Sequence, residues 1–280
     1  MSARSPEAEV GPDEAARAGG EHLLIFARAP VVGRVKTRLF PVLSPTAAAH
    51  LYGAFVIDVV DRHRAPDRQV TLFQAEPGPS WLWQFFAQAV PELGFAVQRG
   101  ADLGARMAAA LRAALAADPE GRVVLIGADS PTLPPAVVDA AFEALEDHTL
   151  VLGPALDGGY YLVGVRGAVP PIFEGPQWGS AAVLAQTLDL AAAAGLRPAL
   201  TEFWYDVDRP EDLAWLARHL PLLPEDEVPQ ATARWVARQA ALVDAAEDEA
   251  GPEADQALAP EPEAGAASGS GPEPKAEPES

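Results

Sequence analysis

The chain has 280 residues, a formal net charge of −20 and no cysteine. The acidic balance disfavours nucleic acid and anionic membranes as partners, and the lack of cysteine excludes disulfides, thiolate metal sites and a cysteine nucleophile. No apolar run approaches the roughly 20 residues that span a bilayer. The N-terminal segment is acidic and lacks the apolar centre of a secretory signal, so we expect a cytoplasmic protein without nucleic-acid or membrane partners.

Composition divides the chain into three zones. Residues 1–20 are rich in Ala, Gly and Glu and are predicted to be disordered. Residues 21–220 alternate apolar with amphipathic segments, which predicts one folded domain. Residues 221–280 are predicted to be a Pro-rich tail with one helix at 229–246 and a disordered end. This tail holds 14 acidic and 3 basic residues, so more than half of the net charge lies outside the predicted domain.

The predicted domain alternates strands with helices. A first strand at 22–28 is followed by a helix at 44–64, with Ser44 as N-cap and Pro45 at its first position. The later elements are expected, in chain order, as strand 69–75, helix 79–90, strand 94–99, helix 103–118, strand 122–128, helix 134–147, strands 149–155 and 160–165, helix 180–195, strand 199–207 and helix 209–220. The alternation predicts an α/β fold whose mostly parallel mixed sheet is covered on both faces and binds ligands at the carboxyl ends of its strands.

Three cations crowd the loop after the first strand. Arg34, Lys36 and Arg38 alternate in the sequence, and in an extended loop they project to one side. Like charges held together favour a bound anion, and Gly33 allows backbone N–H groups to approach it. The loop therefore predicts a phosphate-binding site, with a solvated basic loop as the alternative. The spacing in GRVKT excludes a P-loop, and no G-x-G-x-x-G follows a strand.

Asp129 follows the very apolar predicted strand at 122–128, at the edge of the sheet where ligands are expected. A carboxylate in this position is suited to hold Mg²⁺ or Mn²⁺ and to bridge the ion to phosphates. The competing interpretation is that Asp129 caps the turn that follows, which is a common role of Asp.

Two further carboxylates precede the last helix of the predicted domain. Asp208 and Glu211 have the spacing of a capping box, which predicts a structural role for Asp208 at the helix start. Asp206 has no such role, and in an extended segment it faces the same side as Asp208. Asp206 is therefore predicted as a second ligand of metal or substrate.

A glycine-rich connection joins the strands predicted at 149–155 and 160–165. Asp157, Gly158 and Gly159 form either an ordinary tight hairpin or the floor of a pocket. In the second case Asp157 and Tyr160 would meet the hydroxyl group of an acceptor.

The start of the helix predicted at 103–118 is another candidate, because Asp102 or Arg106 there would contact a ribose or a phosphate; the alternative is a plain junction. No Ser-His-Asp set is readable, which disfavours covalent acyl chemistry. Cations, carboxylates and glycines at strand ends suit transfer from a nucleoside diphosphate or triphosphate, a reaction that rests on positioning and charge stabilisation.

Six motifs in a fixed order resemble a known family: FARAPVVGRVKTRL, ADLGARM, GADSPTLP, GPALDGGYYLVG, QWGS and DVDRPEDL. Across residues 22–220 they are similar to the bacterial glycosyltransferases of the domain-of-unknown-function 2064 (DUF2064) group, some of which are associated with arsenosugar biosynthesis. That group belongs to the nucleotide-diphospho-sugar transferase superfamily, so the resemblance implies a three-layer GT-A-like fold. GADSPTLP is also similar to the metal-binding segment of molybdenum cofactor guanylyltransferases, and VKTRL to the first loop of 2-phospholactate guanylyltransferases.

The resemblance implies roles by position. The phosphate-binding cations would be Arg34, Lys36 and Arg38, with Arg28 at a position where the family often has Lys. The metal ligand would be Asp129, the late acidic pair Asp206 and Asp208, and the acceptor-side turn Asp157, Gly158 and Gly159. GADS lacks the second carboxylate of the usual Asp-x-Asp metal motif.

Residues and resemblance together predict glycosyl transfer from a nucleotide-diphospho-sugar to a small-molecule acceptor, assisted by Mg²⁺ or Mn²⁺, with Asp129, Asp157 and Asp206 in the chemistry. The first alternative is nucleotidyl transfer from a nucleoside triphosphate to a phosphorylated small molecule, with release of pyrophosphate. The second alternative is a non-catalytic nucleotide-binding protein.

Overall fold

The computed structural model describes residues 19–76 and 81–250, with side chains as far as residue 240. The chain divides into two compact units, Met1–Ala237 and Arg238–Ser280. Residues 1–18 and 251–280, which the sequence predicts to be disordered, lie outside the described residues. No helix within the described ranges is both long and apolar enough to cross a bilayer.

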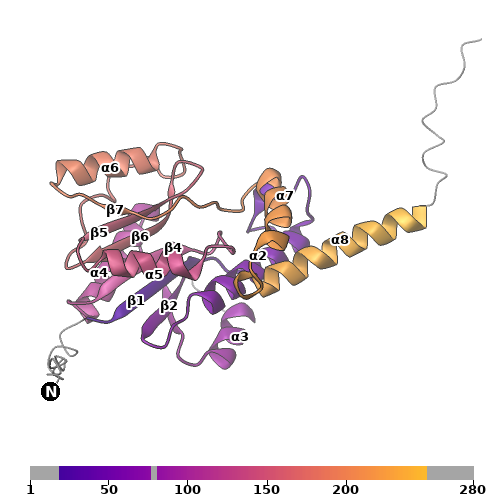
Figure 1. Ribbon diagram of the computed structural model, residues 1–280, viewed down its shortest axis with the longest axis horizontal. Helices are drawn as coiled ribbons and strands as arrows, with labels where there is room; N and C mark the ends of the chain where they lie inside the picture. The colour runs from indigo at the N-terminus through magenta and orange to yellow at the C-terminus, as the bar shows by residue number, and fades with distance from the viewer. Residues whose placement is uncertain (1–18, 77–80, 251–280) are drawn as a thin grey trace, which may run out of the picture. The chain divides into compact units, whose positions relative to one another are not determined.

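Seven strands form one sheet in the described part of the chain, in the order β3-β2-β1-β4-β6-β5-β7 (Figure 1). The strands are β1 (Glu21–Ala27), β2 (Arg68–Gln74), β3 (Gly94–Val97), β4 (Arg122–Gly127), β5 (Leu150–Pro154), β6 (Tyr160–Arg166) and β7 (Ala199–Leu200). Neighbouring strands pair in parallel except for β6, which runs antiparallel to both β4 and β5. The predicted mostly parallel mixed sheet is confirmed.

Helices cover both faces of this sheet, as predicted. They are α2 (Pro45–Arg62), α3 (Trp81–Ala89), α4 (Leu103–Ala117), α5 (Pro135–Ala144), α6 (Val183–Ala193) and α7 (Pro210–His219). Alternate side chains of β1 face opposite ways: Leu23 and Ile25 join a core with α2, α3, α5 and α7, whereas Leu24 and Phe26 join a second core with α4 and α6. Burial on both faces explains why the strand segments are almost continuously apolar.

The reversed strand β6 shapes the edge of the sheet where ligands were expected. Because β6 is antiparallel, it begins at the edge where β4 and β5 end. Ile126 pairs with Leu162, and Pro154 pairs with Tyr160 across a bulge. The turn at 155–159 therefore lies at the same edge as the residues that follow β4.

Two local predictions have opposite outcomes. The N-cap of α2 is confirmed, because Ser44 Oγ accepts a hydrogen bond of 3.1 Å from Ala47 N. The strand predicted at 199–207 is wrong in length, since beyond β7 one bridge joins Ala155 to Trp204. The Tyr161 hydroxyl donates to the carbonyl of Glu202 at 2.7 Å, so a side chain replaces regular strand pairing there.

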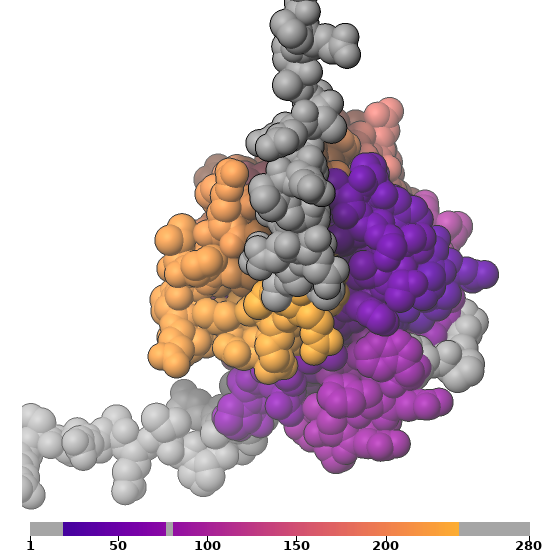
Figure 2. Space-filling view, turned by 90° about the vertical axis from the view of Figure 1, so that its right-hand side faces the viewer, coloured from indigo at the N-terminus to yellow at the C-terminus, as the bar shows by residue number. Residues whose placement is uncertain are grey.

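The first unit extends beyond residue 220 through two 3₁₀ turns, η2 (Leu220–Leu222) and η3 (Glu225–Glu227), to the start of helix α8 (Gln230–Ala250). The Asp58 carboxylate of α2 accepts hydrogen bonds from Ala231 N at 2.8 Å and Thr232 N at 2.6 Å. These bonds satisfy N–H groups that a helix start leaves unpaired. Figure 2 shows the face of the molecule on which α8 begins, with the start of α8 in yellow beside the orange segment that contains α7.

Candidate functional site

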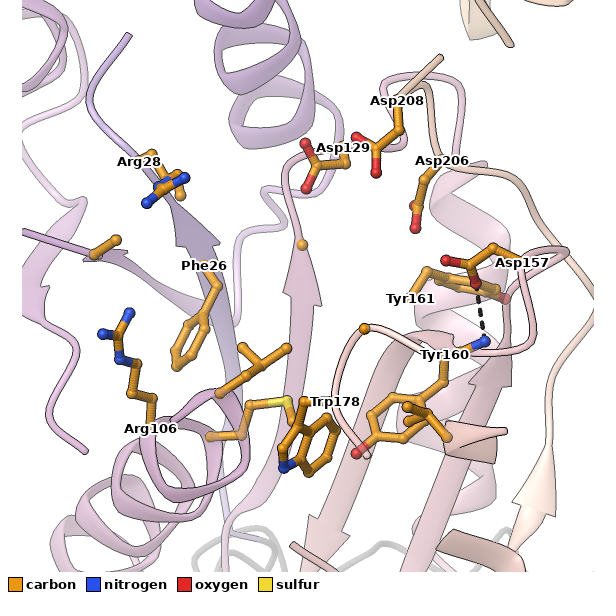
Figure 3. Close-up of a pocket in the computed structure, with 18 of the residues that line it drawn as sticks. Phe26, Arg28, Arg106, Asp129, Asp157, Tyr160, Tyr161, Trp178, Asp206 and Asp208 are labelled. Atoms are coloured by element: carbon orange, nitrogen blue, oxygen red, sulfur yellow. Dashed lines mark hydrogen bonds between the residues drawn. The ribbon is translucent and has the colours of Figure 1, made fainter. Parts of the chain in front are cut away.

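A cleft of about 490 Å³ opens at the carboxyl ends of β1 and β4 and at the start of β6. Figure 3 shows its side chains, with Asp129, Asp206 and Asp208 on one side and Arg28, Phe26 and Arg106 on the other. Of the residues singled out in the sequence, those that line the cleft are Arg28, Lys36, Arg38, Arg106, Asp129, Asp157, Gly159, Tyr160, Asp206 and Asp208. Gly33, Arg34, Asp102 and Gly158 are not among the lining residues.

The basic loop is not extended, so the prediction that its cations project to one side is wrong. Lys36 has a φ of 47° and a ψ of 39°, and the next residues form the 3₁₀ turn η1 (Thr37–Leu39). Val35, before this turn, and Leu39, its last residue, are both buried, which directs Lys36 inward. Arg34 remains exposed to solvent outside the cleft, and the alternating pattern is therefore broken by local helical geometry.

Lys36 connects two carboxylates that lie far apart in the sequence. Its Nζ lies 2.5 Å from Asp129 Oδ1 and 2.8 Å from Asp208 Oδ1, and it faces the rings of Tyr52 and Phe55. The Lys36 side chain is only 3% exposed. Burial opposes its charge, but Asp129 and Asp208 outweigh burial and hold the Lys36 pKa above its ordinary value, so Lys36 carries a positive charge at neutral pH.

Asp208 does not have the predicted capping role. The N-cap of α7 is Arg209, and the Asp212 carboxylate accepts hydrogen bonds from Asp208 N at 3.0 Å and Arg209 N at 2.8 Å. Because Asp212 caps the helix, the Asp208 carboxylate is available to Lys36 and lies 3.5 Å from Arg38 Nη1. Burial alone would raise the Asp208 pKa, but Lys36 and Arg38 lower it, so Asp208 is ionised.

Asp206 is a carboxyl group of the cleft whose pKa is well above its ordinary value. The Ser130 hydroxyl donates a short hydrogen bond to Asp206 Oδ1. Burial, followed by repulsion from Asp129, raises the pKa of Asp206 to about 7. Asp206 therefore takes up a proton more readily than an exposed carboxylate does, chiefly because it is buried.

Asp129 does not cap the turn that follows it. Its carboxylate contacts the Lys36 ammonium and is 43% exposed towards the cleft. Its backbone carbonyl accepts from Val207 N at 2.9 Å, which joins the segment with Asp206 and Asp208 to the end of β4. This backbone bond brings the three carboxylates to one place.

The glycine-rich turn is both a hairpin and a wall of the cleft. Asp157 Oδ1 accepts from Gly159 N at 2.9 Å (Figure 3), an Asx turn between β5 and β6. Gly158 has a φ of 89°, and a Cβ there would lie 2.2 Å from the carbonyl oxygen of Ala181. Only glycine fits that position, so its role is structural, whereas Asp157 and Tyr160 face the cleft.

The start of α4 supplies another wall. Asp102 is the N-cap and accepts from Ala105 N at 2.8 Å, so its carboxylate is used within the helix start. Arg106, one turn later, lines the cleft and donates to the carbonyl of Gly100 at 3.3 Å. On the same side, Arg28 Nη2 lies 3.1 Å from Glu76 Oε1 in an exposed ion pair.

Trp178 lines the cleft, although the sequence analysis did not identify it as a candidate site residue. Its ring meets that of Tyr160 edge-on, with centroids 6.2 Å apart. Gly104 makes room for it, because a Cβ at Gly104 would lie 2.5 Å from Trp178 Cζ2. The only sequence signal was the motif QWGS, which carries no chemistry that points to a cleft.

The amino-acid sequence of the chain is similar to a protein family and to a curated protein of known activity. The family described as an uncharacterized protein conserved in bacteria (DUF2064) matches residues 59–180. A curated relative, 3-phospho-D-glycerate guanylyltransferase of Phenylobacterium zucineum (strain HLK1), is 35% identical over 187 residues, which are 65% of this chain and 84% of the relative. The chain belongs to the DUF2064 family.

The fold of this DUF2064 protein is similar to that of a solved structure. A crystal structure from Desulfovibrio desulfuricans G20, provisionally named a nucleotide-diphospho-sugar transferase, superposes with a TM-score of 0.69 and 32% identity, over 78% of this chain and 97% of that chain. The predicted three-layer GT-A-like fold is thereby confirmed. The names of both relatives are those of transferases, and this DUF2064 protein is a transferase enzyme.

The carboxylates of the DUF2064 protein set limits on a metal site. Among residues 19–76 and 81–240, no three His, Cys, Asp or Glu side chains are arranged to hold a metal ion by themselves. Mg²⁺ and Mn²⁺ commonly take one or two protein carboxylates and complete their shell with water and phosphate oxygens. The exposed Asp129 carboxylate and the nearby Asp206 carboxyl group fit a site of that kind, because a bound cation would favour the ionised form of Asp206.

Gly104→Ala is expected to displace Trp178. The new Cβ would lie 2.3 Å from the carbonyl oxygen of Phe173 and 2.5 Å from the Trp178 ring, and overpacking of this kind costs about 1–3 kcal/mol. Thermal unfolding measures the loss of stability, and near-ultraviolet circular dichroism detects the displaced Trp178 ring. The matched control is Gly53→Ala in α2, whose Cβ would meet Trp81 at 3.3 Å and gain helix propensity. Equal stability of the two variants would contradict the packing role of Gly104.

Asp206→Asn is expected to change how stability depends on pH. The raised Asp206 pKa means that the folded state binds the proton more tightly than the unfolded state does, so ionisation of Asp206 destabilises the fold as pH rises from about 4 to about 7. The variant removes this loss, which we place on the order of 2 kcal/mol because the side chain is partly exposed. Urea unfolding at pH 4.5 and 8 measures it. Asp208→Asn is the control, because the Asp208 pKa is lowered and ionisation of Asp208 therefore stabilises the fold as pH rises. If the free energy of unfolding of Asp206→Asn changed with pH as that of wild type does, the raised pKa of Asp206 would be refuted.

Proposed function

We propose that this DUF2064 protein is a nucleotidyltransferase that transfers a nucleoside monophosphate, most simply from guanosine triphosphate, to the phosphate group of a small phosphorylated acid. The observation that carries the proposal is the 35% identity to a 3-phospho-D-glycerate guanylyltransferase over 84% of that relative. The cleft supports it, because Lys36 and Arg38 stand beside three carboxylates at the carboxyl edge of the sheet. Nucleotidyl transfer therefore replaces glycosyl transfer as the preferred hypothesis for the activity.

In the proposed reaction a phosphate oxygen of the acceptor attacks the α-phosphorus of the donor. The bond between that phosphorus and the oxygen bridging to the β-phosphate breaks, and pyrophosphate leaves with the electron pair. Lys36 and Arg38 are placed to bind the donor phosphates and to stabilise the charge that develops on the leaving group. No protein nucleophile is required, which agrees with a cleft that offers cations and carboxylates.

A divalent ion, Mg²⁺ or Mn²⁺, would be held by Asp129 with Asp206 and Asp208 beside it, and would supply positive charge to the phosphates. Arg28 and Arg106 lie across the cleft from these carboxylates (Figure 3), where they are placed to bind the other end of the donor. Asp157, Gly159 and Tyr160 form the side from which we expect the acceptor to approach.

Glycosyl transfer is the second candidate, because the Desulfovibrio protein of similar fold bears the name of a nucleotide-diphospho-sugar transferase. One experiment separates the two. The protein is incubated with Mg²⁺ or Mn²⁺ and either each nucleoside triphosphate plus 3-phosphoglycerate and related phosphorylated acids, or a panel of nucleotide-sugars. Pyrophosphate release that depends on the acceptor supports nucleotidyl transfer. Nucleoside diphosphate released only from a nucleotide-sugar would replace it with glycosyl transfer.

A further inference from the structure

The position of Lys36 is that of a cation shared by two carboxylates. Its Nζ lies within 2.8 Å of both Asp129 Oδ1 and Asp208 Oδ1, and it is buried beneath them while the carboxylates are 43% and 41% exposed. Carboxylate oxygens that face solvent are the atoms through which a divalent ion would bind from the cleft. A metal ion bound to the same two carboxylates would therefore compete with the Lys36 ammonium for them.

The backbone holds Lys36 in this position. Lys36 is the only non-glycine residue with positive φ in the described part of the chain, and a left-handed conformation is unfavourable for a residue with a Cβ. The buried neighbours Val35 and Leu39 offset this cost and anchor the loop on both sides. The fold of the loop therefore sets the inward direction of Lys36, while its flexible four-carbon stem lets the ammonium turn from the carboxylates to phosphates bound in the cleft.

Charge arithmetic decides whether a metal can join Lys36 on Asp129. A divalent ion held beside an ammonium is repelled by it, and the repulsion is stronger in a partly buried site than in water. The carboxylates Asp129, Asp206 and Asp208 already face Lys36 and Arg38, so they leave little net negative charge for a second cation. A triphosphate adds several negative charges and offers the ammonium new oxygen partners, which removes the conflict.

We propose that without donor Lys36 fills a cation site between Asp129 and Asp208, and that a divalent ion takes this site only when the donor's phosphates take over the ammonium. Metal and donor then bind cooperatively, because each removes the obstacle to the other. The proposal rests on the proposed function in requiring a phosphate-bearing donor, and it adds a role for Lys36 in controlling metal binding.

The first test measures Mn²⁺ binding without nucleotide, by electron paramagnetic resonance of the free ion. Lys36→Met removes the competing ammonium and is expected to tighten Mn²⁺ binding by about tenfold or more. Lys36→Arg keeps the charge and should bind as weakly as wild type. Arg112→Met, which removes one exposed charge from α4, controls for net charge and should also match wild type. Equal or weaker Mn²⁺ binding by Lys36→Met overturns the proposal.

The second test uses the wild-type chain and does not depend on the variants folding. The sequence contains only two lysines, Lys36 and Lys275, so protein labelled with ¹³C at lysine Cε gives two assignable signals. We expect the Lys36 signal to stay in place with Mg²⁺ alone and to move with Mg²⁺ plus guanosine triphosphate or inorganic tripolyphosphate. Movement with Mg²⁺ alone overturns the proposal. Movement with tripolyphosphate in a protein that forms no pyrophosphate would support the exchange and reject the proposed function.

Discussion

Asp129→Asn is expected to reduce the transfer rate by about a hundredfold to a thousandfold while the protein stays folded. Asp129 follows the end of β4, contacts Lys36 at 2.5 Å and is 43% exposed, so its carboxylate faces the cleft and supports no core packing. Steady-state product formation with saturating donor, metal and acceptor measures the loss.

Thermal unfolding of Asp129→Asn provides the control for folding, because the backbone bond from Val207 N to the Asp129 carbonyl is retained. Asp139→Asn in α5 is a matched amide substitution of an exposed carboxylate that lies outside the cleft. If Asp129→Asn kept a rate within tenfold of wild type, the carboxylate would have no part in the chemistry.

Lys36→Met is expected to weaken donor binding by about 10- to 100-fold, the loss of one hydrogen bond to a charged group. It also leaves Asp129 and Asp208 without their shared cation, which we expect to lower the free energy of unfolding by about 2 kcal/mol, a value reduced for the exposure of both carboxylates. Calorimetric titration with guanosine triphosphate and denaturant unfolding measure the two effects.

Addition of Mn²⁺ should restore part of the stability lost in Lys36→Met, since the ion can then pair the two carboxylates. Lys36→Arg is the control that keeps the charge with a different geometry, and we expect donor binding intermediate between wild type and Lys36→Met. Undiminished donor affinity in Lys36→Met would show that the ammonium does not bind phosphates.

The fold was largely predictable from the sequence because its signals are local. Strands such as Leu23 to Ala27 are buried on both faces and are therefore continuously apolar, and Ser44–Pro45 marks a helix start by its own chemistry. The strand at 199–207 was predicted too long because the Tyr161 hydroxyl, distant in sequence, takes the Glu202 carbonyl out of the ladder.

The site was predictable as a set of residues but not as a geometry. Strand ends meet at one edge of a sheet, which predicts that Asp129 and the segment with Asp206 lie near each other. The inward turn of Lys36 was not predictable, because no glycine marks its left-handed backbone. The capping pattern favoured Asp208 with Glu211, whereas Asp212 caps α7, and propensity rules do not distinguish carboxylates so close together.

The reversal of β6 has a consequence for how such enzymes diversify. Because β6 begins where β4 ends, the cleft wall at Asp157–Tyr160 comes from a single hairpin, while the wall opposite comes from β1, its loop and α4. The two walls are thus encoded by separate stretches of the gene. Under the proposed function, mutations in the hairpin would change the choice of acceptor and leave the donor side of the cleft unchanged, which is a route from one scaffold to transferases of different products.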